Sequence, residues 1–321
     1  MNLTEIISPI ARDMKAVDAV IRQRLNSEVV MIRTIGEYII SAGGKRMRPA
    51  MVLMLAKALG YKGTDHHLMA AIIEFIHTST LLHDDVVDES DMRRGRSAAN
   101  AVFGNAASVL VGDYLYSRSF EMMVDIDSMR VMQIVSNATT IIAEGEVLQL
   151  LNVHDPDVSI ERYLQVVRYK TAKLFEAAAQ TGAVIAGATP EQEQAAADYG
   201  RYVGTAFQLI DDVLDYSGDV EALGKNVGDD LSEGKPTLPL IRVMQVGTPE
   251  QRDLIYKAIE TGKADFNAVA VAIRETDALE YTRKIAQEEA DRALAAIAVF
   301  PESDIKNSLI AFCDFSMNRN H

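Results

Sequence analysis

Hydrophobic residues recur with a helical period along nearly the whole chain. No stretch alternates apolar and polar residues between turn signals for long enough to indicate a strand. Prolines fall between the periodic stretches, where helices usually begin or end. These boundary positions are Pro49, Pro156, Pro190, Pro249 and Pro301. The pattern predicts an all-α protein built from about ten or more helices.

Two of the predicted helices carry polar residues along one face. In the helix from about Asp65 to Asp88, one stripe suits the core and consists of Leu68, Ile72, Phe75, Ile76 and Ser79. A second stripe passes from an apolar end to an acidic end through Ile73, His77, Thr80, Asp84 and Asp88. In the helix from about Gln192 to Tyr216, the positions i, i+3, i+4 and i+7 are Gln208, Asp211, Asp212 and Asp215. Both faces are suited to lining a polar pocket.

The same acidic pattern occurs in both helices. The first aspartate motif is Asp84-Asp85-Val86-Val87-Asp88, and the second is Asp211-Asp212-Val213-Leu214-Asp215. Carboxylates at i and i+4 share a helical face and repel one another unless a cation binds. Mg²⁺ prefers such oxygen ligands and keeps waters and substrate phosphates as well. We expect the apolar residues inside each motif to hold it in a buried helix, so that the two motifs bind metal for one diphosphate.

Three further classes of acidic sequence match these residues less well. Isolated Asp-Asp pairs often end helices or face solvent, but here the whole pattern is repeated. An EF-hand needs a loop glycine and a terminal bidentate Glu, which the stretch from Asp84 to Asp91 lacks at the required spacing. Metal-dependent phosphohydrolases of the His-Asp type share the pair His83-Asp84. They need a further metal-binding His well upstream, whereas the upstream candidates share one predicted helix with this pair; they are His66, His67 and His77.

Composition indicates an ordinary globular protein. The 321 residues are 48% hydrophobic and 24% charged, and no linker-like stretch divides them, so we expect a single domain over residues 1–321. One cysteine, Cys313, excludes an intramolecular disulfide framework and a thiolate zinc site. We see no secretory signal and no apolar run near about twenty residues. These features favour the cytoplasm and no membrane anchor.

The net charge of −14 argues against nucleic acid as a partner, because binding a phosphate backbone needs a basic face. Basic residues instead form short clusters beside glycines or beside the aspartate motifs. The clusters are Lys45, Arg46 and Arg48; Arg93, Arg94 and Arg96; and Lys225 with Lys235. Such clusters in an acidic chain suit a small anionic ligand, although we expect Arg46 and Arg96 to face solvent.

Together the motifs resemble those of trans-polyprenyl diphosphate synthases, in particular the long-chain, octaprenyl-type bacterial members. The resemblance covers nearly the whole chain. Its five motifs are residues 43–49 (Gly-Gly-Lys-Arg-Met-Arg-Pro), residues 77–95, Lys170-Thr171, Gln208 with the second aspartate motif, and residues 224–237. The resemblance implies the isoprenoid synthase fold, a single-domain bundle of helices around a central cavity.

The resemblance also implies a reaction. An allylic diphosphate, such as farnesyl diphosphate, ionises; its cation is attacked by the double bond of isopentenyl diphosphate, and loss of a proton leaves a chain five carbons longer. Three Mg²⁺ ions would serve one site, with Asp84, Asp88 and Asp211 as ligands. Asp85, Asp212 and Asp215 would be direct or supporting groups. Fixed cations favour this chemistry because negative charge develops on the leaving diphosphate.

The remaining site residues follow from the family positions. Isopentenyl diphosphate, which keeps its own diphosphate, would bind to Lys45, Arg48, His77 and Arg94. The allylic diphosphate would bind to Arg93, Lys170, Lys225 and Lys235, with Thr171 and Gln208 beside the developing cation. His66, His67, His83 and His154 receive no catalytic role.

Product length depends on an apolar tunnel that leads away from the aspartates. Ser79 and Thr80 precede Asp84 along the predicted helix, and short-chain members tend to place aromatic side chains there. Their small size predicts an open tunnel and a product of six or more isoprene units, with eight favoured by the overall resemblance. Met123, or its neighbours Met122 and Met132, would form a deeper floor, although Met in a helix is as often ordinary core.

Two alternatives remain at this point. A non-catalytic subunit of a heteromeric prenyl synthase would tend to lose aspartates or basic residues, and both sets are intact here. A terpene cyclase of the same fold would need no isopentenyl pocket, against which Gly43-Gly44-Lys45 and Arg48 speak. The family implies a homodimer. We expect release of the long apolar product to need a membrane surface or detergent.

Overall fold

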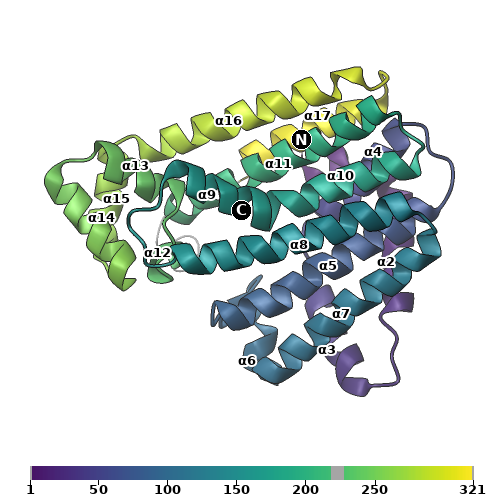
Figure 1. The fold of residues 1–321 in the computed structure, drawn as a ribbon, viewed down its shortest axis with the longest axis horizontal. Helices are drawn as coiled ribbons and strands as arrows, with labels where there is room; N and C mark the ends of the chain where they lie inside the picture. Colours follow the sequence, from purple (N-terminus) through teal and green to yellow (C-terminus); the bar gives the residue numbers. More distant parts are fainter. Residues whose placement is uncertain (1, 218–227, 320–321) are drawn as a thin grey trace. The chain divides into compact units, whose positions relative to one another are not determined.

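The computed structural model describes residues 2–217 and 228–319 and is helical almost throughout (Figure 1). The chain clusters into two compact units. The first unit comprises residues 1–136, 177–197 and 299–311, and the second comprises residues 137–176, 198–298 and 312–321. All the boundaries between the units fall inside helices, which therefore contribute residues to both units. The predicted all-α class is confirmed.

The N-terminal part of the chain forms most of the first unit. Its elements are α1 (Leu3–Ile6), the 3₁₀ turn η1 (Ser8–Ile10), α2 (Ala11–Arg24), α3 (Val30–Ser41), α4 (Met47–Ala58), α5 (Asp65–Val87), β1 (Met92–Arg93), β2 (Arg96–Ser97), α6 (Ala99–Phe103) and α7 (Asn105–Ile126). The remaining elements are α8 (Met129–Asn152), α9 (Ile160–Val166), the π-helical turn η2 (Val167–Ala172), α10 (Lys173–Ile185), α11 (Pro190–Ser217), α12 (Asp229–Ser232), α13 (Leu238–Val246), α14 (Pro249–Thr261), α15 (Phe266–Glu275), α16 (Ala278–Ala296), the 3₁₀ turn η3 (Ile297–Val299) and α17 (Asp304–Asn318).

Helix α4 is the centre of the first unit. Its residues from Ala50 to Ala56 are fully buried, as expected for a helix that is apolar on all sides. Helices α2 and α5 pack against it. Gly182 of α10 also lies so close that a Cβ there would be 2.6 Å from the carbonyl oxygen of Val52. The absence of a side chain at Gly182 therefore allows α10 to pack directly against α4.

Helix α5 is the element that carries the first aspartate motif. It extends for 23 residues, which is about 34 Å, and Asp88 caps its C-terminal end. It packs along α7, where the Ser79 hydroxyl donates a hydrogen bond to the carbonyl oxygen of Gly112 at 2.8 Å. The expected boundaries are confirmed. The expected burial of the apolar residues inside the motif is wrong for Val87, which is 65% exposed because it belongs to the last turn.

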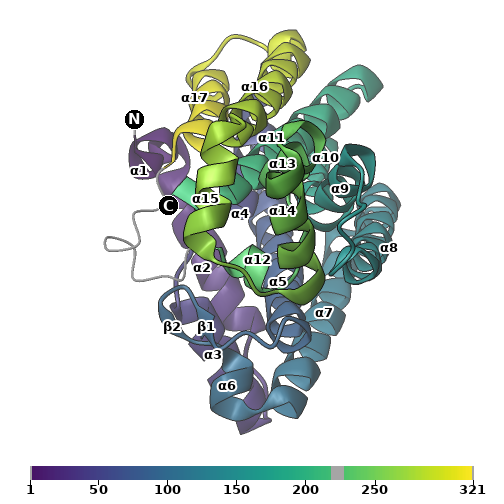
Figure 2. The same ribbon diagram turned by 90° about the vertical axis from the view of Figure 1, so that its left-hand side faces the viewer.

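A small hairpin follows α5. Strands β1 and β2 pair in antiparallel register, and the two residues between them, Arg94 and Gly95, both have positive φ (53° and 73°). This is the backbone of a tight two-residue hairpin turn, in which glycine is favoured. The strands have two residues each, too few for alternation to appear in the sequence. Figure 2 shows the hairpin beside α3 and α6.

The second unit has its own core, formed where α12 to α16 meet the end of α11 (Figure 2). Its members include Tyr216, Leu240, Val243, Ile255 and Val269, all almost fully buried. The prolines lie where the sequence predicted boundaries. Pro190 and Pro249 begin α11 and α14, Pro49 lies in the first turn of α4, and Pro156 and Pro301 lie in loops.

Candidate functional site

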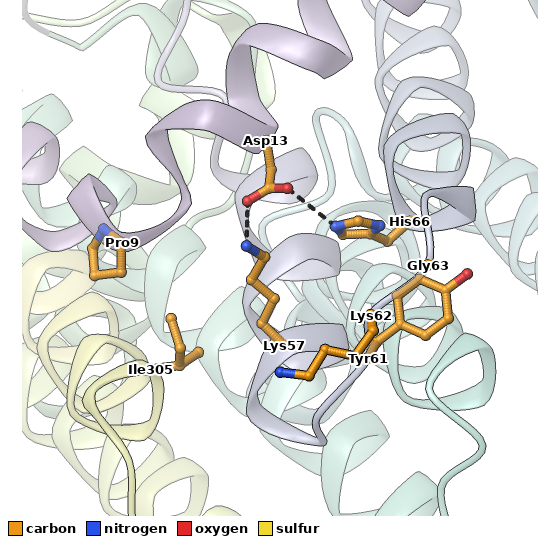
Figure 3. Close-up of a pocket in the computed structure, with 8 residues that line it drawn as sticks. All are labelled: Pro9, Asp13, Lys57, Tyr61, Lys62, Gly63, His66 and Ile305. Atoms are coloured by element: carbon orange, nitrogen blue, oxygen red, sulfur yellow. Dashed lines mark ion pairs between the residues drawn. The ribbon is translucent and has the colours of Figure 1, made fainter.

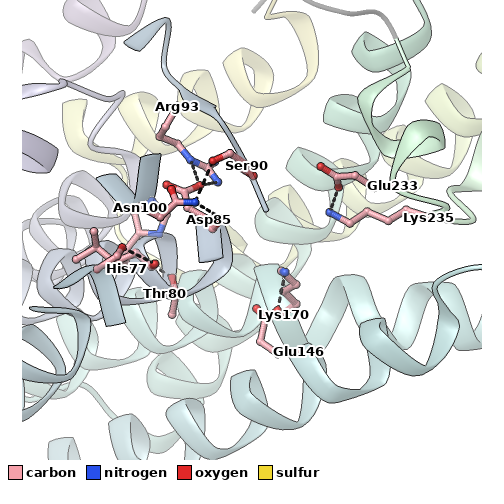
Figure 4. Close-up of polar contacts among 12 residues, drawn as sticks. His77, Thr80, Asp85, Ser90, Arg93, Asn100, Glu146, Lys170, Glu233 and Lys235 are labelled. Carbon is pink, nitrogen blue, oxygen red and sulfur yellow. Dashed lines mark hydrogen bonds and ion pairs between the residues drawn. The ribbon is translucent and has the colours of Figure 1, made fainter. Parts of the chain in front are cut away.

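The first aspartate motif places its three carboxylates in different environments. Asp84 and Asp88 are half-buried and one helical turn apart at the end of α5, whereas Asp85 is fully buried. Both Nε and Nη2 of Arg93 donate to Oδ1 of Asp85, with Nε at 2.8 Å (Figure 4). Asn100 donates to the backbone carbonyl oxygens of Asp85 and Ser90 and so holds the end of α5 to the following loop. Asp85 thus positions Arg93.

A cluster of cations surrounds His77, two turns before Asp84 on α5. Nη1 of Arg48 lies 3.4 Å from Nε2 of His77. Burial, followed by the charges of Arg48 and Arg94, lowers the pKa of His77 well below its ordinary value. The imidazole is therefore neutral near neutral pH and offers a hydrogen bond rather than a charge. Three of the four residues predicted to bind isopentenyl diphosphate share this neighbourhood.

The loop from Gly43 to Arg46 lies against the same cluster. The Arg94 guanidinium donates to the carbonyl oxygen of Gly43, and a Cβ on Gly44 would lie 2.7 Å from Cζ of Arg94. Gly44 also has a φ of 148°. The close approach and the positive φ both require glycine there. Lys45, the fourth predicted residue, follows directly and is half-buried.

Arg46 corrects one sequence-based expectation. Its side chain is only 17% exposed, and Nη1 lies 3.0 Å from the carboxylate of the buried Glu74. Arg46 adopts a left-handed conformation at the start of α4 (φ 49°), which turns the side chain inward. Burial raises the pKa of Glu74, while the Arg46 charge opposes that rise. The pair therefore fixes the glycine loop to α5, one turn before His77. Arg96 is exposed, as expected.

The second aspartate motif, on α11, also contains a buried middle aspartate. Oδ1 of Asp212 accepts a hydrogen bond from Gln208 Nε2 at 2.9 Å, and Oδ2 accepts one from the Tyr163 hydroxyl. Burial, followed by the charge of Asp230, raises the pKa of Asp212 well above its ordinary value. Both oxygens of Asp212 are engaged with neighbouring side chains. Binding a metal through Asp212 would therefore require one of these hydrogen bonds to break.

Lys170 and Thr171 lie on the π-helical turn η2, which interrupts the helix between α9 and α10. Such turns are rare and are found frequently at functional sites. The Thr171 hydroxyl donates to Oε1 of Gln208 at 3.0 Å, so these two predicted residues are in contact. The Lys170 ammonium lies 2.6 Å from Oε2 of Glu146 on α8 (Figure 4).

The other residues of the second motif have partners that the sequence did not indicate. Asp211 is paired with Arg319, whose Nη2 lies 2.7 Å from Oδ1. The same guanidinium stacks on Phe207 and donates to its carbonyl oxygen at 2.6 Å. Asp215 is half-buried on the same helix. The C-terminal end of the chain therefore neutralises Asp211 in this structure.

Lys235 is half-buried and ion-paired with Glu233 (Figure 4). Its loop is fixed by His154, whose backbone nitrogen donates to the carbonyl oxygen of Gly234 at 2.8 Å. A Cβ on Gly234 would lie 2.2 Å from the His154 ring, so the loop passes directly over the imidazole. Lys225, another predicted ligand of the allylic diphosphate, lies outside the described residues.

The residues predicted to line the product tunnel lie in or beside the packing of α5 and α7. Ser79 is 2% exposed and hydrogen-bonded to α7, while Thr80 is half-buried and donates to the carbonyl oxygen of His77 at 2.8 Å. Met122 and Met123 are buried on α7, and Met132 is half-buried on α8. Their placement is compatible with ordinary core packing, so the tunnel stays a prediction.

Comparison with known proteins supplies the family. The family model described as "Polyprenyl synthetase" matches residues 29–276. The chain belongs to this family. It is 55% identical to octaprenyl diphosphate synthase of Escherichia coli over all of both chains. It is 45% identical to the geranyl-diphosphate-specific all-trans-nonaprenyl-diphosphate synthase of Rhodobacter capsulatus, over 98% of this chain and 97% of that one.

Solved structures agree. A polyprenyl synthase from Caulobacter crescentus, complexed with calcium and isoprenyl diphosphate, superimposes with a TM-score of 0.95 at 43% identity, covering 100% of this chain and 98% of that one. The likeness extends through both units. This polyprenyl synthetase family member is thus a chain-elongating prenyltransferase with the all-α isoprenoid synthase fold. No helix within residues 2–217 and 228–319 has the length and apolar character needed to cross a bilayer.

Five residues that contact the predicted site residues carry no signal in the sequence of this family member: Glu74, Asn100, Glu146, Tyr163 and Arg319. Glu74 and Tyr163 lie on buried helical faces, where their side chains look like part of the core pattern. Arg319 stands far along the sequence from the motif it contacts, and no local pattern signals such a pair. The buried carboxylate of Glu74 pairs with Arg46, whose backbone is in the left-handed region. Only the tertiary structure reveals a contact of this kind.

Proposed function

We propose that the chain synthesises octaprenyl diphosphate by repeated addition of isopentenyl diphosphate to an allylic diphosphate such as farnesyl diphosphate. The observation that carries this proposal is the full-length identity of 55% to an octaprenyl synthase, compared with 45% to a nonaprenyl synthase. The intact acidic and basic motifs support catalysis by this chain itself. An octaprenyl chain would serve as a quinone side chain.

The residues of the first aspartate motif fit a hard divalent cation. Asp84 and Asp88 offer half-buried carboxylates one turn apart. In addition, Oδ2 of Asp85 is buried and has no hydrogen-bond partner within the described part of the chain. We propose Mg²⁺ as the metal, three ions per site, held by Asp84, Asp88 and Asp211. Bound Mg²⁺ would stabilise the negative charge that develops as diphosphate leaves.

Asp211 must change its contacts in order to bind Mg²⁺, because the Arg319 guanidinium is ion-paired with its Oδ1. Asp212 cannot easily replace it, since both of its oxygens accept hydrogen bonds from other side chains. In the proposal, Arg319 moves aside or transfers its hydrogen bond to the substrate diphosphate, which carries more charge than one carboxylate. Asp85, Asp212 and Asp215 then hold and orient the ligands rather than bind them.

The basic residues divide between the two substrates. The cluster of Lys45, Arg48, His77 and Arg94 would bind isopentenyl diphosphate without metal, so that its own diphosphate is not activated for leaving. Guanidinium groups suit bidentate phosphate contacts, and the neutral His77 adds a hydrogen bond. Arg93, Lys170, Lys225 and Lys235 would bind the allylic diphosphate. Lys170 then exchanges Glu146 for a phosphate oxygen.

The hydrogen-bonded pair of Thr171 and Gln208 would lie beside the allylic cation. Their oxygen dipoles stabilise positive charge without acting as nucleophiles. The π-helical turn widens the helix at Thr171 and so presents the residue to the reacting carbons. The departing diphosphate is the proposed acceptor of the proton lost after condensation.

A direct assay tests the proposal. Purified protein is incubated with farnesyl diphosphate, labelled isopentenyl diphosphate and Mg²⁺, and product length is read by chromatography. We expect octaprenyl diphosphate as the main product, and no extension to a long polyprenyl product would contradict the proposal. Asp84→Ala and Asp211→Ala should each abolish turnover, while circular dichroism shows the helical fold intact. The exposed Asp253→Ala is the matched control and should retain activity.

A further inference from the structure

A second group of potential metal ligands lies at the opposite end of α5 from the first aspartate motif. His66 and His67 begin this helix, and Asp13 of α2 lies beside them. One ligand atom from each of the three lies within 4.8 Å of the others. His66 and Asp84 are 18 positions apart on α5, which is about 27 Å. The group is therefore separate from the first aspartate motif.

The spacing of these atoms fits a tetrahedral transition-metal site. Bond lengths of about 2.0–2.2 Å in tetrahedral geometry place two ligand atoms about 3.3 Å apart. Nε2 of His66 lies 3.4 Å from Oδ1 of Asp13, which already matches. Nε2 of His67 lies 2.8 Å from the same oxygen, so this hydrogen bond would have to be exchanged for a bond to the metal.

The buried side chain of His66 is the feature that indicates a ligand. Its side chain is 2% exposed, Nδ1 has no hydrogen-bond partner among residues 2–217 and 228–319, and Nε2 has the 3.4 Å ion-pair contact with Asp13. A buried ring nitrogen without a hydrogen-bond partner is costly, and this imidazole lines an open pocket of about 400 Å³ together with Asp13, Lys57 and Tyr61 (Figure 3). The pocket gives a metal ion a path to Asp13 and His66 and room for a water as fourth ligand.

The donor set suits a borderline cation. Two imidazoles and one carboxylate match the donor preference of Zn²⁺.

Neighbouring residues orient the three side chains. The Lys57 ammonium lies 2.6 Å from Oδ2 of Asp13, whereas His66 contacts the other oxygen, Oδ1 (Figure 3). The Tyr61 ring meets the His66 ring edge to face at 5.2 Å, and a Cβ on Gly63 would lie 2.3 Å from the Tyr61 hydroxyl. Such outer contacts fix the ligands before the metal arrives. The Lys57 charge also weakens the site relative to one without a nearby cation.

We propose that Asp13, His66 and His67 form a second metal site, selective for Zn²⁺ or a similar borderline cation, that ties the start of α5 to α2. This second site goes beyond the proposed function, because the metals proposed for catalysis are hard cations held by aspartates alone. The ion would stabilise the helix that carries His77 and Asp84 at its other end. The role is structural: the bound metal stabilises the folded first unit.

Zn²⁺ binding to the purified full-length protein tests the site. The titration is done in excess Mg²⁺, which occupies the aspartate motifs but competes poorly for imidazole nitrogen. A chromophoric chelator reports Zn²⁺ affinity, and differential scanning calorimetry reports Tm. We expect one Zn²⁺ per chain and a rise in Tm with Zn²⁺. His66→Gln and His67→Gln should each weaken Zn²⁺ binding by at least about tenfold and remove the rise in Tm.

Two control variants make the result specific. His154→Gln removes an imidazole that instead contacts the carbonyl oxygen of Ile259, and it should bind Zn²⁺ like the unmodified protein. Asp84→Ala should also keep the Zn²⁺ site although it loses prenyl transfer, which separates this site from catalysis. Unchanged Zn²⁺ affinity in both His66→Gln and His67→Gln, or no Zn²⁺ binding in excess Mg²⁺, would overturn the proposal. His67 is partly exposed, so its variant tests the site even if His66→Gln fails to fold.

Discussion

Several single residues in this prenyltransferase take their roles from a partner far along the chain. Arg46 is held by the buried Glu74, Asp212 by Tyr163, and Asp211 by Arg319. In each case a charged or polar group inside the protein has found a partner of opposite charge or a hydrogen-bond donor, because an unsatisfied one would be costly. These partners determine which contacts each side chain makes in the folded protein.

His77 leads to a prediction about pH at the residue scale. Its pKa in the folded protein lies well below the unfolded value of about 6.5, mainly through burial. Below about pH 6.5 the unfolded chain takes up a proton on His77 that the folded protein does not, so the free energy of unfolding decreases as pH falls. Above about pH 6.5 the His77 ring has no effect on stability. Near pH 5.5 the loss attributable to His77 is at most about 1.4 kcal/mol, the limit for a ring that stays neutral in the folded protein.

Urea unfolding at about pH 7.5 and pH 5.5 measures this effect in the unmodified protein and in His77→Gln. The variant should lose less stability between the two pH values, by up to about 1.4 kcal/mol. His83→Gln controls for the loss of an imidazole elsewhere on α5. Equal losses in the unmodified protein and in His77→Gln would show that His77 is protonated in the folded protein.

At the scale of elements, α5 connects several properties of the protein. Its start carries the proposed Zn²⁺ ligands, its middle carries His77 and Ser79, and its end carries the first aspartate motif. Because a helix is rigid over this length, the tight packing of α5 against α7 at Ser79 and Gly112 fixes where the aspartates lie. A larger side chain at that contact should therefore affect both the packing of α5 against α7 and the length of the product.

Ser79→Phe should shorten the product, because the aromatic ring would block a chain growing along α5. Ser79 is buried against α7, so the added volume will also cost stability, about 1–3 kcal/mol for overpacking. Product length is measured by mass spectrometry after reaction with isopentenyl diphosphate. Ser79→Ala removes the hydroxyl without adding bulk and should leave product length unchanged. If Ser79→Phe folds and still makes the full-length product, Ser79 does not border the growing chain.

At the scale of the whole molecule, we propose that the protein is a homodimer and that residues 1–321 act as one synthase domain. The family model extends from the first unit into the second. Large apolar side chains are exposed on α7 and α8, among them Leu110, Val124, Leu150 and Leu151, each at least 64% exposed. Side chains of this kind are often covered by a partner subunit.

Light scattering coupled to size-exclusion chromatography tests the dimer. The unmodified protein should elute with twice the mass of the chain, and Leu150→Lys combined with Leu151→Lys should shift it toward the monomer. Glu144→Lys changes an exposed charge on the same helix and serves as the control, with the dimer retained. A monomeric mass for the unmodified protein over a range of concentrations would refute the proposal.

The sequence by itself determined the all-α class, the limits of α5 and α11, and the family, because helical periodicity, boundary prolines and ordered motifs are local signals. It also predicted which residues would bind a diphosphate. Only the tertiary structure decided that Asp85 holds Arg93, that Arg46 turns inward, and that Asp13 lies beside His66 and His67. The last two contacts join distant parts of the chain, and all three depend on burial, which no local pattern encodes.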